Sequence, residues 1–247
     1  METTIKKAAK INQSITLKAL IIGFLTLILL IPGLMIQDLI RERQNRSLET
    51  IEKINNKWSN AQTFCGPVIS IPYTTTQVNP DNKTTMQEHL LNITPENLNI
   101  TTQLFPEERY YGIYKTILYK SEIDITGNFD KINFPKPENS IIHWEQAYLS
   151  IGVSDLRGIT ENIDFKLDNK QLSVEATGNL DTQIGKMLVM PLKNTDPLLF
   201  SQPQTFNCKL KLNGSSNINF IPIGKTTKVH VTGNWKSPGF IGNFSPE

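Results

Sequence analysis

The sequence predicts a mainly β protein, in which an antiparallel β-rich domain, built as a sandwich or a curved sheet, is anchored by one N-terminal transmembrane helix. Two observations support this fold class. Residues 19–36 form an apolar stretch in which Thr26 is the only polar side chain. From Phe64 onward, apolar and polar residues alternate with a period of two between recurring turn residues, which is typical of β-strands.

The apolar stretch is long enough to cross a bilayer. Its 18 residues rise about 1.5 Å each, which gives roughly 27 Å and approaches the thickness of the hydrocarbon core. Pro32 and Gly33 are tolerated in a membrane helix because neighbouring groups bond to the freed carbonyl. A cleaved signal peptide needs small residues in an A-x-A pattern, which residues 34–37 do not provide. We expect an uncleaved anchor; a cleaved signal peptide and a buried core helix are the alternatives.

Basic residues flank the predicted span almost equally, so their count does not decide its orientation. On the N-terminal side they are Lys6, Lys7, Lys10 and Lys18; on the C-terminal side they are Arg41, Arg43, Arg46 and Lys53. Long domains translocate largely regardless of their own charge, whereas a short tail is easily retained. We therefore expect residues 1–18 to be cytoplasmic and the large domain to lie outside.

Residues 37–62 are predicted to form a juxtamembrane amphipathic helix, since they contain no Pro or Gly. The less polar positions at helical spacing are Leu48, Ile51, Ile54 or Asn55, and Trp58. Two interpretations stay open. The arginines and Trp58 could touch lipid headgroups, or the stripe could pack against the outer domain while the charges face water.

The β-rich domain is predicted to cover residues 63–247. Its clearest strands are 68–71 between Pro67 and Pro72, 98–104 before Pro106, 163–167, 172–176, 206–212, 218–221 and 229–231. Residues 168–170 predict a hairpin turn, because Asp and Asn tolerate the positive φ of a tight turn. A further hairpin is predicted where residues 206–212 turn through 213–215 into 218–221. Residues 77–85 are predicted to be an exposed loop.

Composition and motifs argue against several function classes. A net charge of +2 is unlike a dedicated nucleic-acid binder, and 2 cysteines are too few for a disulfide scaffold or a cysteine-based zinc site. The chain has no G-x-S-x-G, G-x-x-x-x-G-K or H-E-x-x-H motif. His89, His143 and His230 are widely separated, whereas metal ligands usually come grouped. We therefore predict neither catalytic residues, nor a metal site, nor a cofactor.

Two groups of residues could suggest chemistry but have simpler interpretations. Ser154, Asp155 and Arg157 could belong to a hydrolytic site, yet Ser-Asp-x-Arg-Gly after a strand is also a turn. Glu107 and Glu108 are adjacent and so point in different directions, which favours ion pairing or capping over acid–base catalysis.

Cys65 and Cys208 are 143 residues apart. A disulfide between them would close a long loop, but each thiol also fits the pattern of a small buried hydrophobic side chain. The sequence leaves the choice between the two open.

Four stretches, in this order, resemble one family, the CreD-type inner-membrane proteins, also called the colicin-tolerance family of bacterial envelope proteins. They are residues 36–43 leading to 65–68 (CGPV), 105–114 (FPEERYYGIY) with 119–121, 144–158 (WEQAYLSIGVSDLRG), and 212–215 (LNGS) through 222–224 to 234–242 (NWKSPGFIG). The resemblance covers nearly the whole chain.

The resemblance implies a bacterial inner-membrane protein with a periplasmic domain and further membrane helices, and with roles in envelope stress, cell shape and tolerance to colicins or β-lactams. It supplies no catalytic residues, because no reaction is established for the family. Two departures stand out. Cys65 stands where the family pattern tends to be aliphatic, and the chain stops before the later membrane helices. We therefore expect an N-terminal portion whose β domain is incomplete at its C-terminus.

The expected partners are the lipid bilayer, other envelope proteins and the C-terminal transmembrane half. Aromatic residues beside arginines form a candidate interaction patch, because Tyr, Trp and Arg are enriched at binding hot spots. Its members are Arg109, Tyr110, Tyr111, Trp144, Arg157 and Trp235. The alternative functions are an envelope lipid- or glycan-binding carrier and, more remotely, a periplasmic hydrolase.

Overall fold

The computed structural model describes residues 15–78, 84–132, 139–182, 185–192, 200–235 and 238–242. The chain divides into two compact units, Met1–Thr50 and Ile51–Glu247. The prediction for 77–85 falls partly on residues 79–83, which lie outside the described residues, and its flanks belong to strands.

The N-terminal helix α1 spans Ile15–Trp58 and is continuous through Pro32. Within the described residues, it is the one helix long and apolar enough to cross a membrane by length and composition. The predicted span 19–36 and most of the predicted juxtamembrane helix are therefore parts of a single helix. The mainly β fold class with one N-terminal apolar helix is confirmed.

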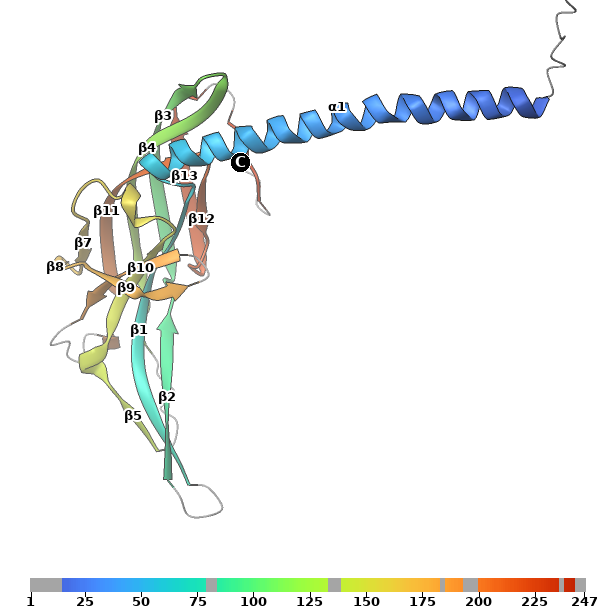
Figure 1. Cartoon of the computed structure of the whole chain (residues 1–247). Coiled ribbons are helices and arrows are strands. Elements are labelled where there is room, and N and C mark those ends of the chain that lie inside the picture. Colours follow the sequence, from blue (N-terminus) through green and yellow to red (C-terminus); the bar gives the residue numbers. More distant parts are fainter. Residues whose placement is uncertain are drawn as a thin grey trace, which may run out of the picture. The chain divides into compact units, whose positions relative to one another are not determined.

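The β domain contains two sheets (Figure 1). In sheet A the strands are β1 (Gln62–Val78), β2 (Thr84–Ile93), β5 (Ser140–Ile142), β6 (Tyr148–Val153), β9 (Glu175–Thr182), β10 (Gly185–Pro191) and β12 (Ile218–Ile221). Their order is β12-β1-β6-β10-β9, and β2 and β5 also pair with β1. Strand β1 thus pairs with more strands of this sheet than any other strand does.

Sheet B has the order β13-β3-β4-β11-β7-β8. Its strands are β3 (Asn97–Tyr111), β4 (Tyr114–Phe129), β7 (Asp164–Leu167), β8 (Lys170–Leu172), β11 (Gln204–Ser215) and β13 (Thr226–Gly233). Two short 3₁₀ helices, η1 (Trp144–Gln146) and η2 (Leu156–Gly158), flank β6.

One hydrophobic core joins the two sheets. Sheet A contributes residues such as Phe64 and Ile151, and sheet B contributes residues such as Ile125 and Leu210. In β11 every second residue from Gln204 to Leu212 is buried, so its apolar side chains face the core and its lysines face solvent. Each fully buried Leu, Ile or Phe contributes roughly 1.5–3 kcal/mol, which makes this alternation the main determinant of the fold.

The predicted hairpin at residues 168–170 is confirmed. Strands β7 and β8 pair in antiparallel fashion, and Asp168 and Asn169 both have positive φ, 43° and 65°. This is the combination that a two-residue type I′ turn requires. The predicted second strand, 172–176, is divided, because β8 ends at Leu172 and β9 begins at Glu175 in the other sheet.

The predicted hairpin between residues 206–212 and 218–221 is wrong. After β11 the chain leaves sheet B, and β12 pairs in parallel with β1 in sheet A. Strand β13 then returns to sheet B and pairs in parallel with β3. Turn residues indicate that a strand ends, but they do not determine which strand the following one joins.

The prolines expected to end strands lie inside them. Pro67 lies at a register shift between β1 and β6, where the ladder is already irregular. Pro72 lies where β1 passes from its last partner in β6, opposite Ser70, to its first partner in β5, opposite Tyr73. Pro106 lies beyond Leu104, the last β3 residue paired with β13. Proline is tolerated at such positions because pairing on one side of the strand is irregular, changes partner or has ended there.

Candidate functional site at the end of the membrane helix

The last two turns of α1 carry a stripe of partly buried residues. Ile51, Ile54, Asn55 and Trp58 are partly buried, whereas Leu48 is 66% exposed. The predicted stripe is therefore confirmed from Ile51 onward and wrong at Leu48. These turns belong to the same compact unit as the β domain, which favours the packing interpretation for this part of the helix.

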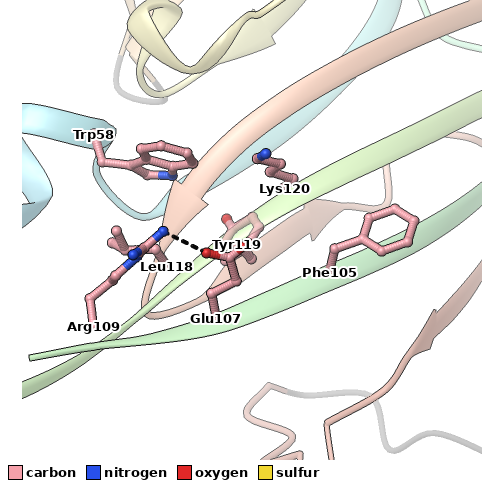
Figure 2. A pocket seen from close by; sticks show the side chains of 7 residues that line it. All are labelled: Trp58, Phe105, Glu107, Arg109, Leu118, Tyr119 and Lys120. Carbon is pink, nitrogen blue, oxygen red and sulfur yellow. Dashed lines mark hydrogen bonds and ion pairs between the residues drawn. The ribbon is translucent and has the colours of Figure 1, made fainter.

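The helix end lies over one face of the β3–β4 hairpin. Thr116 Oγ1 donates a hydrogen bond to Asn55 Oδ1 at 3.3 Å. Trp58 lines a hollow with alternate residues of β3 and with three consecutive residues of β4. The lining residues are Trp58, Phe105, Glu107, Arg109, Leu118, Tyr119 and Lys120 (Figure 2).

The hollow is small. Its volume is about 10 Å³, which is room for roughly one water molecule, whereas ligand pockets usually measure about 300–1,000 Å³. Arg109 Nη2 donates to Glu107 Oε2 at 2.7 Å, as the dashed line in Figure 2 shows. This hollow therefore gives no support to a lipid or glycan carrier.

A buried polar cluster continues from the hollow to the start of β1. The fully buried Gln62 places its Nε2 within 3.0 Å of Ser59 Oγ, Asp155 O and Asn213 O. Its Oε1 accepts from the Asp155 backbone N–H at 3.2 Å. Because a buried amide is costly unless it is hydrogen-bonded, these contacts hold the end of α1, β1, η2 and β11 in one arrangement.

Asp155 and Arg157 complete this cluster. Arg157 donates through Nε and Nη2 to the two carboxylate oxygens of Asp155, at 2.9 and 2.7 Å. Its Nη1 donates to the backbone oxygen of Asn56 at 2.9 Å, so it also satisfies a carbonyl at the C-terminal end of α1. The Arg157 hydrogen bonds, with the Asn60 and Arg157 backbone N–H groups, lower the pKa of Asp155 to about 2.

Two glycines allow this close packing. A Cβ on Gly158 would lie 2.3 Å from Asn213 O and 2.4 Å from Gln62 Nε2. A Cβ on Gly214 would lie 2.2 Å from the Tyr119 hydroxyl oxygen. Both glycines are needed here because no side chain fits at these contacts. The prediction that residues 154–158 form a turn is confirmed, since the Asp155 carboxylate accepts from the Arg157 N–H at the start of η2.

The tip of the β3–β4 hairpin exposes large side chains. The strands are joined by Gly112 and Ile113, and Gly112 has φ 59°, as a two-residue hairpin turn with glycine first requires. Tyr110, Tyr111 and Ile113 are 65%, 67% and 73% exposed. We call Tyr110, Tyr111, Gly112 and Ile113 the hairpin tip.

The six residues of the candidate patch do not all lie together. Arg109, Tyr110 and Tyr111 share the end of β3, whereas Arg157 lies in η2 and bonds to Asn56 near the end of α1. Trp144 stacks on Phe200 with ring centroids 5.5 Å apart, and Trp235 is partly buried beyond β13. Sequence reasoning missed Gln62, Ser59 and Tyr119, because nothing in a single polar residue or tyrosine signals that it bridges distant segments.

The other titratable residues show no catalytic arrangement within the described residues, and no group of three His, Cys, Asp or Glu there could hold a metal ion. His143 has Glu145 Oε1 at 3.5 Å from Nδ1 and Thr74 Oγ1 at 3.3 Å from Nε2. Cys65 and Cys208 are both free and buried, and burial raises the pKa of each thiol.

The sequence is similar to one protein family and to a curated relative. The family described as "Inner membrane protein CreD" matches residues 14–247. Inner membrane protein CreD of Escherichia coli strain K12 is 28% identical over 223 residues, which is 89% of this chain and 49% of that protein. The chain thus spans about half the length of this curated relative. No solved structure matches it.

Proposed function

Because the chain belongs to the CreD family of inner membrane proteins, we propose that it is a non-enzymatic protein of the bacterial envelope. Its β domain acts in the envelope stress response, in cell-shape maintenance and in tolerance to colicins or β-lactams. The family match along residues 14–247 is the observation that carries this proposal.

The site at the end of α1 supports a structural role rather than a catalytic one. Its polar side chains bond to one another and to backbone groups: Gln62 to Ser59 and Asn213, and Arg157 to Asp155 and Asn56. Such contacts join the C-terminal end of α1 to the two sheets. A domain held in this way can present a surface to other proteins. The proposed partners are other envelope proteins and the C-terminal transmembrane half that the family resemblance implies.

We place the N-terminus in the cytoplasm and the β domain in the periplasm. Fusions at the C-terminus test this placement in living cells. Alkaline phosphatase should be active and green fluorescent protein dark, because the first folds only outside and the second only inside. A bright fluorescent fusion with an inactive phosphatase would reverse the proposed topology.

The cellular role is tested by deleting the gene in its native host. The deletion strain should become more susceptible to β-lactams, change its response to colicins and lose its normal cell shape under envelope stress. Re-expression of the wild-type gene from a plasmid should restore all three phenotypes. Unchanged susceptibility and shape in the deletion strain would contradict the proposed function.

A further inference from the structure

Strand β13 is an edge strand of sheet B that lacks the usual protection of such strands. Within the residues that the structure describes, it pairs with β3 alone, through a parallel ladder without a register shift. Proteins commonly protect an edge strand by keeping it short or by adding prolines, bulges or lysines. The other edge strand of sheet B, β8, has only three residues. Strand β13 has eight, with no proline and a single lysine, Lys228.

Two valines of β13 extend the core face of sheet B beyond the covered core. In the parallel register Val229 lies beside Ile100 and Val231 lies beside Thr102. These two β3 residues are 1% and 0% exposed, whereas Val229 and Val231 are 43% and 42% exposed. Paired residues of neighbouring strands share a face of the sheet, so the valines lie on the face that packs into the core. Sheet B therefore ends in two apolar side chains that the β domain leaves partly uncovered.

The main chain of β13 offers hydrogen-bonding groups to a further strand. The Thr226 N–H donates to Glu96 O at 2.9 Å at the start of the ladder. In a parallel ladder every second residue of a strand bonds to the same neighbour, so the residues between them direct their N–H and C=O groups outward. These outward residues are Thr227, Val229, Val231 and Gly233. An extended polypeptide is the partner that such a row of donors and acceptors fits.

A second copy of β13 fits this row in the antiparallel register centred on His230. There Val229 of one copy lies opposite Val231 of the other, and Thr227 lies opposite Gly233. All outward residues then pair with outward residues, which gives about eight main-chain hydrogen bonds. A register centred one residue away in either direction leaves one outward residue of each copy without a partner.

The side chains suit the same register. On the core face each Val229 meets a Val231 across the two strands, and pairs of β-branched side chains stabilise neighbouring strands. On the opposite face Lys228 lies opposite Thr232, so the two lysines do not meet. The chain has a net charge of only +2, so overall repulsion between two copies is small.

We propose that β13 pairs with β13 of a second copy of this chain, antiparallel about His230. The pairing joins two six-stranded sheets into one continuous sheet across a two-fold axis. Main-chain hydrogen bonds and the apposed valines form the contact. This inference uses only residues of the β domain and does not depend on the cellular role proposed above.

Disulfide cross-linking of the full chain in membranes of its native host tests this pairing. His230→Cys places two thiols on the two-fold axis, where opposite Cα atoms of a non-hydrogen-bonded pair are about 4.5 Å apart and a disulfide can form. Thr101→Cys is the matched control, because Thr101 is exposed and lies beside His230 on β3. Its two copies would be three strand spacings apart, roughly 14 Å. Cys65 and Cys208 are buried, so the introduced thiol is the accessible one.

With a mild oxidant, His230→Cys should give a product of twice the monomer mass on a non-reducing gel, several times more abundant than for Thr101→Cys. The register has its own test in two differently tagged chains. Lys228→Cys should cross-link to Thr232→Cys, but Lys228→Cys alone should not cross-link, because its copies would be four residues apart along the strands, roughly 13 Å.

Adding Val229→Lys and Val231→Lys to the His230→Cys chain should abolish the cross-link by placing like charges opposite each other. The circular dichroism of the purified chain should keep its strand signal, because both side chains are already partly exposed. No cross-link in His230→Cys, or equal cross-linking of His230→Cys and Thr101→Cys, would overturn the proposal. A product of another mass would also overturn it, since a strand of a different protein would then occupy the edge.

Discussion

At the scale of single residues, Gln62 shows how one buried polar side chain can join four segments. It is fully buried, and its amide reaches Ser59, Asp155 and Asn213. An unsatisfied buried amide costs about 1–3 kcal/mol, so every partner must stay in place. The Ser-Asp-x-Arg-Gly turn was predictable from its composition, whereas its bonds to Gln62 and to the helix end were not.

Gly158→Ala should destabilise the β domain by roughly 1–3 kcal/mol, because the new methyl group would overlap the Asn213 carbonyl and the Gln62 amide. The free energy of unfolding, measured by urea titration with tryptophan fluorescence, checks this. Gly239→Ala is the matched control, since a Cβ there meets nothing within 4 Å. Equal stability of the two variants would mean that the close approach at Gly158 is not needed.

Asp155→Asn should lower the free energy of unfolding by roughly 1–2 kcal/mol at neutral pH, because the partly exposed Arg157 loses its charged partner. The pKa of Asp155 is lowered from 3.8 to about 2 in the folded protein, so the unfolded chain takes up its proton first as the pH falls. The stabilisation is therefore present above about pH 4 and disappears as the pH falls through about 2.

Unfolding measured from pH 7 to pH 2 should show the wild-type chain converging on the Asp155→Asn variant. Asp124→Asn serves as the control, because Asp124 is exposed and 4.0 Å from its lysine partner, and such pairs contribute little. A gap between wild type and Asp155→Asn that does not change with pH would rule out the charge as its cause.

At the scale of elements, the end of α1 and the β3–β4 hairpin form one packed unit. Residues 51–58 supply the partly buried stripe, and the hairpin receives it. The helical spacing of the less polar residues was visible in the sequence, but the sequence did not show which of them face the hairpin. Leu48 fits the apolar pattern, yet it is exposed, because whether an apolar residue is buried depends on what lies opposite.

Trp58→Ala should destabilise the β domain by about 1–3 kcal/mol, less than a fully buried tryptophan, because Trp58 is only partly buried. Hydrogen exchange of residues 51–58 should accelerate in the full chain in lipid or detergent. Leu48→Ala should change stability by no more than about 0.5 kcal/mol. Similar effects of the two substitutions would show that the helix end does not pack on the hairpin.

At the scale of the whole molecule, strands near the end of the chain pair with strands near the start of the β domain. Residues 62–65 pair with 218–221, and residues 97–104 pair with 226–233, both in parallel. The two cysteines lie in different sheets, one in β1 and one in β11, as buried side chains. Their role as small core residues is what the alternating pattern around Cys208 indicated.

Both thiols should react slowly with a maleimide in the folded chain and rapidly in denaturant, because burial raises the pKa of Cys65 and raises that of Cys208 to about 12. Mass spectrometry of the labelled protein gives the count. The chain should run identically on gels with and without reductant. A mobility difference, or two thiols that stay blocked in denaturant until reduced, would reveal a disulfide.

The sequence by itself determined the apolar helix, the alternation of the strands and the turn at Asp168 and Asn169, because each depends on neighbours within a few residues. It also carried the ordered motifs that the family match confirms. Tertiary structure alone decided that β12 pairs in parallel with β1 in one sheet and β13 with β3 in the other. It also decided that strands run through Pro72 and Pro106, and that Gln62 bridges the helix end to η2 and β11. These outcomes depend on contacts between segments far apart in the chain, and local composition does not encode which segments meet.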